Sequence, residues 1–116
     1  MNSREKGARG EREACEALGR IGLDCRRSVQ YCGQTGVADL ICDAELHVEV
    51  KLTERLNPYA FMDQAIRDSA RTRRAPLVVM RSNHKPWLIC CRIDDIPRIA
   101  EEIIRARDSR VQPAAE

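Results

Sequence analysis

The seven residues Leu46–Leu52 alternate strictly between apolar and ionisable side chains. Successive side chains of a β-strand point to opposite faces, so this alternation predicts a strand whose second face carries His47, Glu49 and Lys51. Glu49 and Lys51 would project from that face about 6–7 Å apart. Unpaired charge is costly to bury, so this face indicates either a functional site or the salt-bridged outer face of a two-stranded ribbon, with Lys51 pairing Glu49 or Asp43.

The remaining elements are predicted from apolar spacing and from residues that begin or end helices. Pro58 occupies the favoured first position of a helix, and Asp94 is expected to cap the last helix. We expect helices over residues 3–22, 58–73 and 94–106, and further strands over residues 26–31, 37–42, 76–81 and 87–92. This order predicts an α/β fold with a central mixed β-sheet flanked by helices. The 116 residues make one domain, expected over residues 1–107, with a flexible C-terminal tail over residues 108–116.

Composition excludes several classes of protein. Four aromatic residues are too few to bind single-stranded nucleic acid by stacking successive bases. Arginines make up 17 of the 20 basic residues, so a net charge of +2 is compatible with local basic faces that bind phosphate. No apolar run reaches the ~18–20 residues of a membrane span, and the first residues contain no apolar signal core. We therefore expect a soluble cytoplasmic protein with no membrane partner.

The six cysteines do not indicate a zinc site. No Cys-x-x-Cys pair is present, and neither His47 nor His84 lies at a zinc-ligand spacing from a cysteine. A disulfide framework would require export from the cell. We expect free thiols that pack as small apolar side chains.

Two carboxylates are expected to converge on the charged strand face. Asp39 lies on the preceding strand, and nine residues separate it from Glu49. Carboxylates that meet from adjacent strands repel one another unless a cation lies between them, and oxygen ligands suit Mg²⁺ or Mn²⁺ rather than zinc. Lys51 beside such an ion could hold a phosphate oxygen or help to orient and deprotonate a water molecule.

The first helix offers a third acid. Glu11 and Glu13 lie on either side of the apolar stripe of this helix, so either could face a site at the edge of the sheet, and the geometry slightly favours Glu11. Both residues could equally be ordinary charges on a helix surface.

Several segments together resemble the PD-(D/E)XK nuclease superfamily. The stretch Lys6–Glu13, the pair Arg27-Ser28, and the strands that carry Asp39 and Glu49-Val50-Lys51 are most similar to archaeal-type Holliday junction resolvases. The later stretch Glu54–Tyr59, with Gln64 and with Trp87-Leu88, is similar to small phage-type resolvase-like members. The resemblance spans residues 3–95. Ala38 stands where the family usually has a proline, and the loop before Asp39 is longer than in the short archaeal forms.

The resemblance implies a restriction-endonuclease-like fold and a divalent-metal-dependent DNA endonuclease, structure-selective on branched DNA, that leaves a 5′-phosphate and a 3′-hydroxyl. It implies Mg²⁺, with Mn²⁺ able to substitute, held by Glu11, Asp39 and Glu49. Lys51 would be the catalytic lysine, and Gln64 would support the site.

The resemblance and the distribution of arginines together suggest the DNA contacts. The residues expected to bind DNA are Arg9, Arg12, Arg26, Arg27 and Ser28, with further contacts from Arg4, Lys6 and the cluster Arg67, Arg71, Arg73 and Arg74. That cluster could instead be a solvated helix end. A homodimer is expected because symmetric cleavage of two strands suits a two-fold assembly. The alternatives are a noncatalytic DNA-binding or assembly module on the same fold, and a nicking or repair-type nuclease of the same superfamily.

Overall fold

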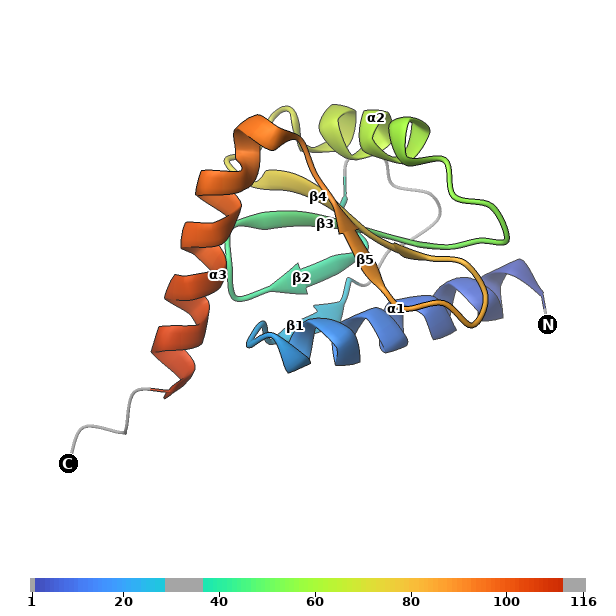
Figure 1. The fold of residues 1–116 in the computed structure, drawn as a ribbon, viewed down its shortest axis with the longest axis horizontal. Coiled ribbons are helices and arrows are strands. Elements are labelled where there is room, and N and C mark those ends of the chain that lie inside the picture. Colours follow the sequence, from blue (N-terminus) through green and yellow to red (C-terminus); the bar gives the residue numbers. More distant parts are fainter. Residues whose placement is uncertain (1, 29–36, 112–116) are drawn as a thin grey trace.

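A five-stranded mixed sheet forms the centre of the structure, a computed structural model that describes residues 2–28 and 37–111 (Figure 1). The elements follow one another as α1 (Ser3–Arg20), β1 (Cys25–Arg27), β2 (Leu40–Cys42), β3 (Leu46–Leu52), α2 (Pro58–Ser69), β4 (Ala75–Arg81), β5 (Leu88–Cys90), the 3₁₀ turn η1 (Ile93–Asp95) and α3 (Ile96–Val111).

The strands lie in the sheet in their order along the chain, β1 to β5. β3 pairs parallel with β4 through the crossover helix α2, and the other neighbouring strands pair antiparallel. The predicted mixed sheet with flanking helices is therefore confirmed. β3 lies in the middle of the sheet, so its backbone is paired on both sides and both of its faces are covered.

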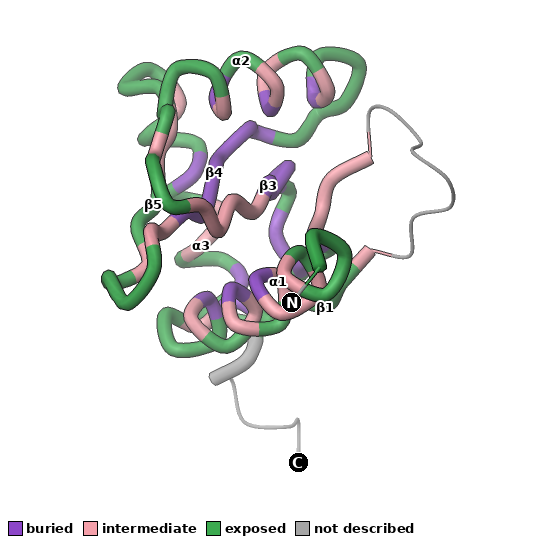
Figure 2. The backbone as a smooth tube through the Cα atoms, turned by 90° about the vertical axis from the view of Figure 1, so that its right-hand side faces the viewer, coloured by how far each residue is buried: buried purple, intermediate pink, exposed green. Residues whose placement is uncertain are grey.

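The helices cover the two faces of the sheet unequally. Figure 2 shows α2 on one side of the sheet, with α1 and α3 on the other. The larger core lies on the side of α1 and α3, where Leu18 and Ile99 pack against Val48 and Leu77. The smaller core lies under α2, where Met62 and Ala65 pack against Val78 and Met80. The charged face of β3 is turned towards α2, and its apolar face is turned towards α1.

Gly10 lets α1 approach β3 closely. A Cβ atom at this position would lie 3.2 Å from the Cβ atom of Leu52, which is tighter than ordinary packing allows. The absence of a side chain therefore brings the next residue, Glu11, beside the C-terminal part of β3. No helix among residues 2–28 and 37–111 is long and apolar enough to cross a bilayer.

The predicted ends of the helices differ from those observed. α2 ends at Ser69 rather than near residue 73, because the amide and the hydroxyl of Thr72 both donate to the Ser69 carbonyl and close the last turn. Asp94 does not cap the last helix: it lies within η1, and α3 begins only at Ile96. α3 then continues to Val111, so residues 108–111, predicted as tail, are helical; no glycine or proline interrupts this stretch.

Two predicted strands are longer than the observed ones. β2 begins at Leu40 rather than at residue 37, and β5 spans only Leu88–Cys90. β1 covers Cys25–Arg27, and residues 29–31 of the predicted extended segment lie outside the described part of the chain.

Candidate metal and nucleic-acid site

The ionisable face of β3 is buried. His47 and Glu49 are each only 2% exposed, and β3 lies between β2 and β4 rather than at an edge. The interpretation of this face as the salt-bridged outer surface of a two-stranded ribbon is therefore wrong. A carboxylate buried to this degree requires compensating partners, which come from the neighbouring elements.

Asp39 lies next to Glu49, as the sequence predicted. Its Oδ2 atom accepts a hydrogen bond from the backbone amide of Val50 at 2.8 Å, and its own amide donates to the Val48 carbonyl at 3.0 Å. These bonds hold the Asp39 carboxylate against β3. Burial, followed by the nearby charge of Glu49, raises the pKa of Asp39 to about 7, although the hydrogen bond from the Val50 amide acts in the opposite direction. The two carboxylates therefore form a site that favours added positive charge.

Of the two acids proposed on α1, Glu11 faces this site. Its Oε1 atom accepts a hydrogen bond from Nε of Arg27 in β1 at 2.9 Å, and its charge contributes to the raised pKa of Asp39. Glu13 instead accepts a hydrogen bond from Arg81 at 2.6 Å and lies 3.8 Å from Arg9. The choice of Glu11, which the helix geometry favoured only slightly, agrees with this arrangement.

Lys51 is positioned by α2. Its Nζ atom donates to Oε1 of Gln64 at 2.8 Å and lies 5.5 Å from the centre of the Phe61 ring. Lys51 and Glu11 also line a small groove of about 240 Å³ between the N-terminal part of α1 and the end of β3, together with Lys6 and Thr53. This groove is open to solvent, so a phosphate group could approach both side chains.

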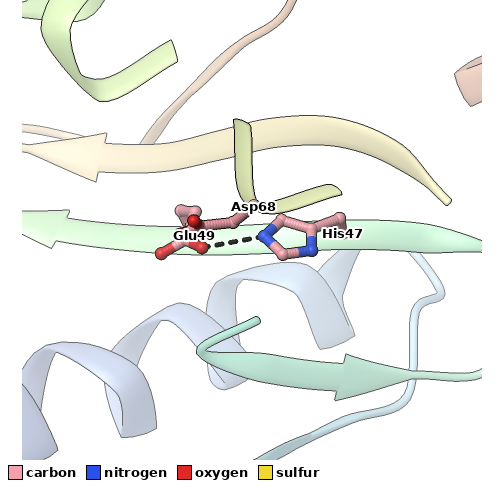
Figure 3. A group of neighbouring side chains, drawn as sticks. All are labelled: His47, Glu49 and Asp68. Carbon is pink, nitrogen blue, oxygen red and sulfur yellow. Dashed lines mark hydrogen bonds and ion pairs between the residues drawn. The ribbon is translucent and has the colours of Figure 1, made fainter. Parts of the chain in front are cut away.

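Two residues of the cluster around Glu49 were given no role in the sequence analysis. His47 Nε2 lies 2.8 Å from Glu49 Oε1, and Asp68 of α2 places a carboxylate oxygen within 4.8 Å of both ligand atoms (Figure 3). The alternation of β3 placed His47 on the same face as Glu49. The spacing of four residues between Gln64 and Asp68, which puts both on one face of α2, could have indicated the second.

The residues expected to contact DNA fall into different environments. Arg27 is paired with Glu11 and Arg9 lies beside Glu13, whereas Arg12 and Arg26 are exposed. The Ser28 amide donates to the Asp39 carbonyl at 3.0 Å, which ties the end of β1 to the site. Arg74 donates to the Ala44 carbonyl, next to the start of β3 and therefore at the opposite end of that strand from Lys51.

The donor set fits a hard divalent cation. Glu11, Asp39 and Glu49 offer carboxylate oxygens, the ligands that Mg²⁺ and Mn²⁺ prefer. Burial is the main cause of the raised pKa of Asp39, and the charges of Glu49 and Glu11 add to it, so a cation among the three acids would offset both effects. Lys51 lies on the same strand face, where it could neutralise charge on a bound phosphate.

Comparisons with known proteins agree with this geometry. The sequence profile of the phage PDDEXK endonuclease family matches residues 2–112. Among solved structures, Hjc, a Holliday junction resolvase of the archaeal hyperthermophile Archaeoglobus fulgidus, is similar with a TM-score of 0.58. The two chains share 16% identity, over 72% of this chain and 75% of the resolvase chain, which establishes a common fold. No curated protein sequence matches the chain.

Proposed function

Because its sequence belongs to the phage PDDEXK endonuclease family, we propose that this chain is a divalent-metal-dependent endonuclease that hydrolyses phosphodiester bonds in branched DNA. The expected restriction-endonuclease-like fold is confirmed by the structural likeness to the archaeal resolvase. The observation that carries the proposal is the convergence of Asp39 and Glu49 beside Lys51 on a central strand.

Three acids would hold the metal ion. Glu11 lies in α1, Asp39 directly precedes β2 and Glu49 lies in β3, so a cation among them would connect three separate parts of the chain. We propose Mg²⁺, with Mn²⁺ able to substitute, because the donors are oxygens. When bound, such an ion polarises the scissile phosphate and lowers the pKa of a coordinated water.

The other site residues would bind and orient the substrate. Lys51 carries a positive charge that would stabilise the negative charge developing on the phosphoryl oxygens. The hydrogen bond from Lys51 to Gln64 fixes the direction of the ammonium group before the substrate arrives. Lys6 and Arg27 border the same site and would hold neighbouring phosphates, which positions the DNA without reading its sequence.

Selectivity for branched DNA is the finer part of the proposal. The solved structure with the similar fold is named as a Holliday junction resolvase. A junction contains two strands to be cut at equivalent places, and a two-fold homodimer would place one site on each. Contacts restricted to phosphates favour recognition of DNA shape over base sequence.

A cleavage assay tests the proposal directly. A labelled four-way junction, a linear duplex and a splayed fork would each be incubated with Mg²⁺, Mn²⁺ or EDTA. The proteins would be the wild type, Lys51→Ala and, as a matched control, Lys85→Ala at an exposed site between β4 and β5. We expect paired nicks on the junction, lost in EDTA and in Lys51→Ala but retained in Lys85→Ala.

The other outcomes of this assay would reject part or all of the proposal. Equal cutting of all three substrates would retain the metal-dependent nuclease and reject branch selectivity, as expected for a nicking or repair-type enzyme. Tight junction binding with no cleavage under any metal would contradict the proposal and support a noncatalytic DNA-binding module. Cleavage by Lys51→Ala at the wild-type rate would reject the assigned role of Lys51.

A further inference from the structure

A buried histidine contacts the Glu49 side chain from the start of the same strand. His47 Nε2 and Glu49 Oε1 are 2.8 Å apart, and both side chains are 2% exposed. Figure 3 shows the imidazole ring and the Glu49 carboxylate side by side above β3, joined by this contact. The two residues are separated by one position in a strand, so the alternation of β3 alone aligns them on one face.

The chemistry of the pair assigns the direction of the hydrogen bond. A carboxylate that binds a metal ion is ionised and can only accept, so as a metal ligand Glu49 would accept at Oε1 from Nε2 of His47. This contact engages one of the two carboxylate oxygens of Glu49, and the same carboxylate also interacts with Asp39. A metal ligand whose other oxygen is already bound to a fixed donor loses little rotational freedom when the ion binds.

The surroundings of His47 restrict its own movement. The same face of the sheet carries Val78 and Met80 on β4, and Met62 and Ala65 of α2 pack over them. A side chain that is 2% exposed in such a packed layer has few alternative rotamers. His47 is therefore a rigid donor, anchored in the core rather than in a loop.

We propose that His47 is a positioning residue that orients Glu49 for metal binding. It touches neither the substrate nor the ion, and it acts through the single hydrogen bond to Glu49. This role rests on the proposed function, because it assumes that Glu49 is a metal ligand.

Asp68 offers a control for this proposal. Its carboxylate lies within 4.8 Å of the same two ligand atoms, so the three residues could instead form a separate metal site of their own. The positioning role is favoured because the 2.8 Å contact already provides Glu49 with a hydrogen-bond donor. The two possibilities predict different effects of an Asp68 substitution on Mn²⁺ binding.

The test compares variants that keep or remove the donor. In His47→Gln, the side-chain amide nitrogen reaches about as far as Nε2 and can still donate. In His47→Leu the volume is similar but the donor is lost, and in His47→Asn the donor is too short to reach Oε1. Asp68→Asn removes the nearby charge and leaves the His47–Glu49 bond intact. Circular dichroism and thermal melting would establish that each variant folds.

Mn²⁺ binding without DNA is the first readout, measured from the free Mn²⁺ signal in electron paramagnetic resonance. We expect His47→Leu and His47→Asn to bind Mn²⁺ about 10–100-fold more weakly than the wild type. We expect His47→Gln to stay within about threefold of the wild type, and Asp68→Asn to be unchanged. In junction cleavage at saturating metal, kcat should fall in His47→Leu while KM for the DNA stays constant.

The outcomes separate the positioning role from the proposed function. Wild-type Mn²⁺ affinity in His47→Leu, or in His47→Asn if the leucine variant does not fold, would overturn the positioning role alone. Equal losses in His47→Gln and His47→Leu would overturn it as well, because they would show a requirement for the ring itself. A parallel loss of bound Mn²⁺ in Asp68→Asn would favour a separate metal site. A wild-type protein that binds no Mn²⁺ would overturn the proposed function, and the positioning role with it.

Discussion

At the scale of single residues, the Asp39 carboxylate lies where its negative charge destabilises the fold but would bind a metal ion. Burial and the neighbouring Glu49 raise the pKa of its carboxyl group to about 7, from an ordinary value of 3.8. Below about pH 7 the folded protein therefore prefers the protonated form of Asp39, and the charged form of this residue destabilises the fold. This destabilisation is absent below about pH 4, grows as the pH rises from 3.8 to 7, and is complete above pH 7.

We therefore expect Asp39→Asn to stabilise the metal-free protein at alkaline pH. In EDTA at pH 8, the free energy of unfolding should rise by about 1–2 kcal/mol, which corresponds to about 4–8 °C in Tm for each kcal/mol. Asp39 is partly exposed, so solvent screens its charge and reduces the gain in stability. The difference from wild type should shrink towards zero as the pH falls to 4. Thermal melts over this pH range measure it.

Added Mg²⁺ provides the control for this prediction. The ion should raise the Tm of the wild type and leave that of Asp39→Asn nearly unchanged, since the variant lacks one ligand charge. A variant that is less stable than the wild type at pH 8 in EDTA would contradict the assigned cost of the charge.

Arg27 supplies the positive charge that is paired with the Glu11 carboxylate. The two side chains form a hydrogen-bonded ion pair at 2.9 Å, with Arg27 45% exposed. A metal ion at Glu11 must compete with this guanidinium. We expect Arg27→Ala to bind Mn²⁺ up to about fivefold more tightly, because an exposed pair of this kind contributes about 0.2–1 kcal/mol.

The same substitution should weaken binding to DNA, since it removes a charge from the border of the site. Mn²⁺ titration and junction binding in the presence of Ca²⁺ would measure the two effects separately. Arg26→Ala is the matched control: its exposed side chain should leave Mn²⁺ affinity unaltered. Weaker Mn²⁺ binding in Arg27→Ala would contradict the competition between the guanidinium and the ion.

At the scale of elements, the register of β1 and β2 places two thiols directly opposite one another. Cys25 is the partner of Cys42, and backbone bonds from Asp43 to Asp24 and from Ser28 to Asp39 flank them. Cys25 and Cys42 therefore form a non-hydrogen-bonded pair of the ladder, where side chains approach most closely. A hydrogen bond from Cys25 lowers the pKa of Cys42 to about 7.

We expect a thiol oxidant such as diamide to join Cys25 and Cys42 in a disulfide. The Cα separation of such a pair falls within the range that a disulfide can span, and the low pKa of Cys42 supplies a thiolate near neutral pH. Peptide mapping should show the bond in the wild type and in Cys15→Ser but not in Cys42→Ser. Closing this short loop should stabilise the protein by about 2–3 kcal/mol. Oxidation that leaves both thiols free would contradict the prediction.

Elements with strong local signals could be predicted from the sequence almost to the residue. The alternation of Leu46–Leu52 reproduces the bounds of β3, and Pro58 marks the start of α2. The ends of α2 and α3 could not be located, because they depend on a Thr72 hydroxyl bond and on an uninterrupted helix past residue 107. Periodicity carries little information about such local bonds.

Within the site, too, some contacts could be predicted from the sequence and others could not. The convergence of Asp39 with Glu49 followed from the alternation of β3 and from the assumption that neighbouring strands pair. The contacts of Arg27 with Glu11 and of His47 with Glu49 were not predicted. They depend on how close α1 approaches β1 and on side-chain rotamers, neither of which is encoded in residue spacing.

At the scale of the whole molecule, an apolar surface lies exposed beside α2. Tyr59 at the start of α2 and Ile93 in η1 are each 86% exposed. They line a groove of about 650 Å³ between α2 and the segment that follows β5, together with Met62 and Ile66. Grouped apolar side chains on a surface commonly mark an interface, and a two-fold axis would pair this surface with itself.

We expect this surface to form the interface of the proposed homodimer. Ile93→Glu should convert the dimer to a monomer, because a two-fold interface would bring two carboxylates together. The stability of the monomer should be unchanged, since Ile93 is 86% exposed. Ile104→Glu, at a 54% exposed position on α3, is the matched control and should remain dimeric. Sedimentation velocity at micromolar concentrations measures both.

Cleavage provides a second, independent measure of the same surface. A monomeric Ile93→Glu variant keeps all of the site residues, so it should still nick a junction, but the two nicks should become uncoupled and appear at separate times. Ile104→Glu should produce paired nicks like the wild type. A wild-type protein that sediments as a monomer at all concentrations, yet makes paired nicks on the junction, would show that the two cuts need no stable dimer and would reject this surface as the interface.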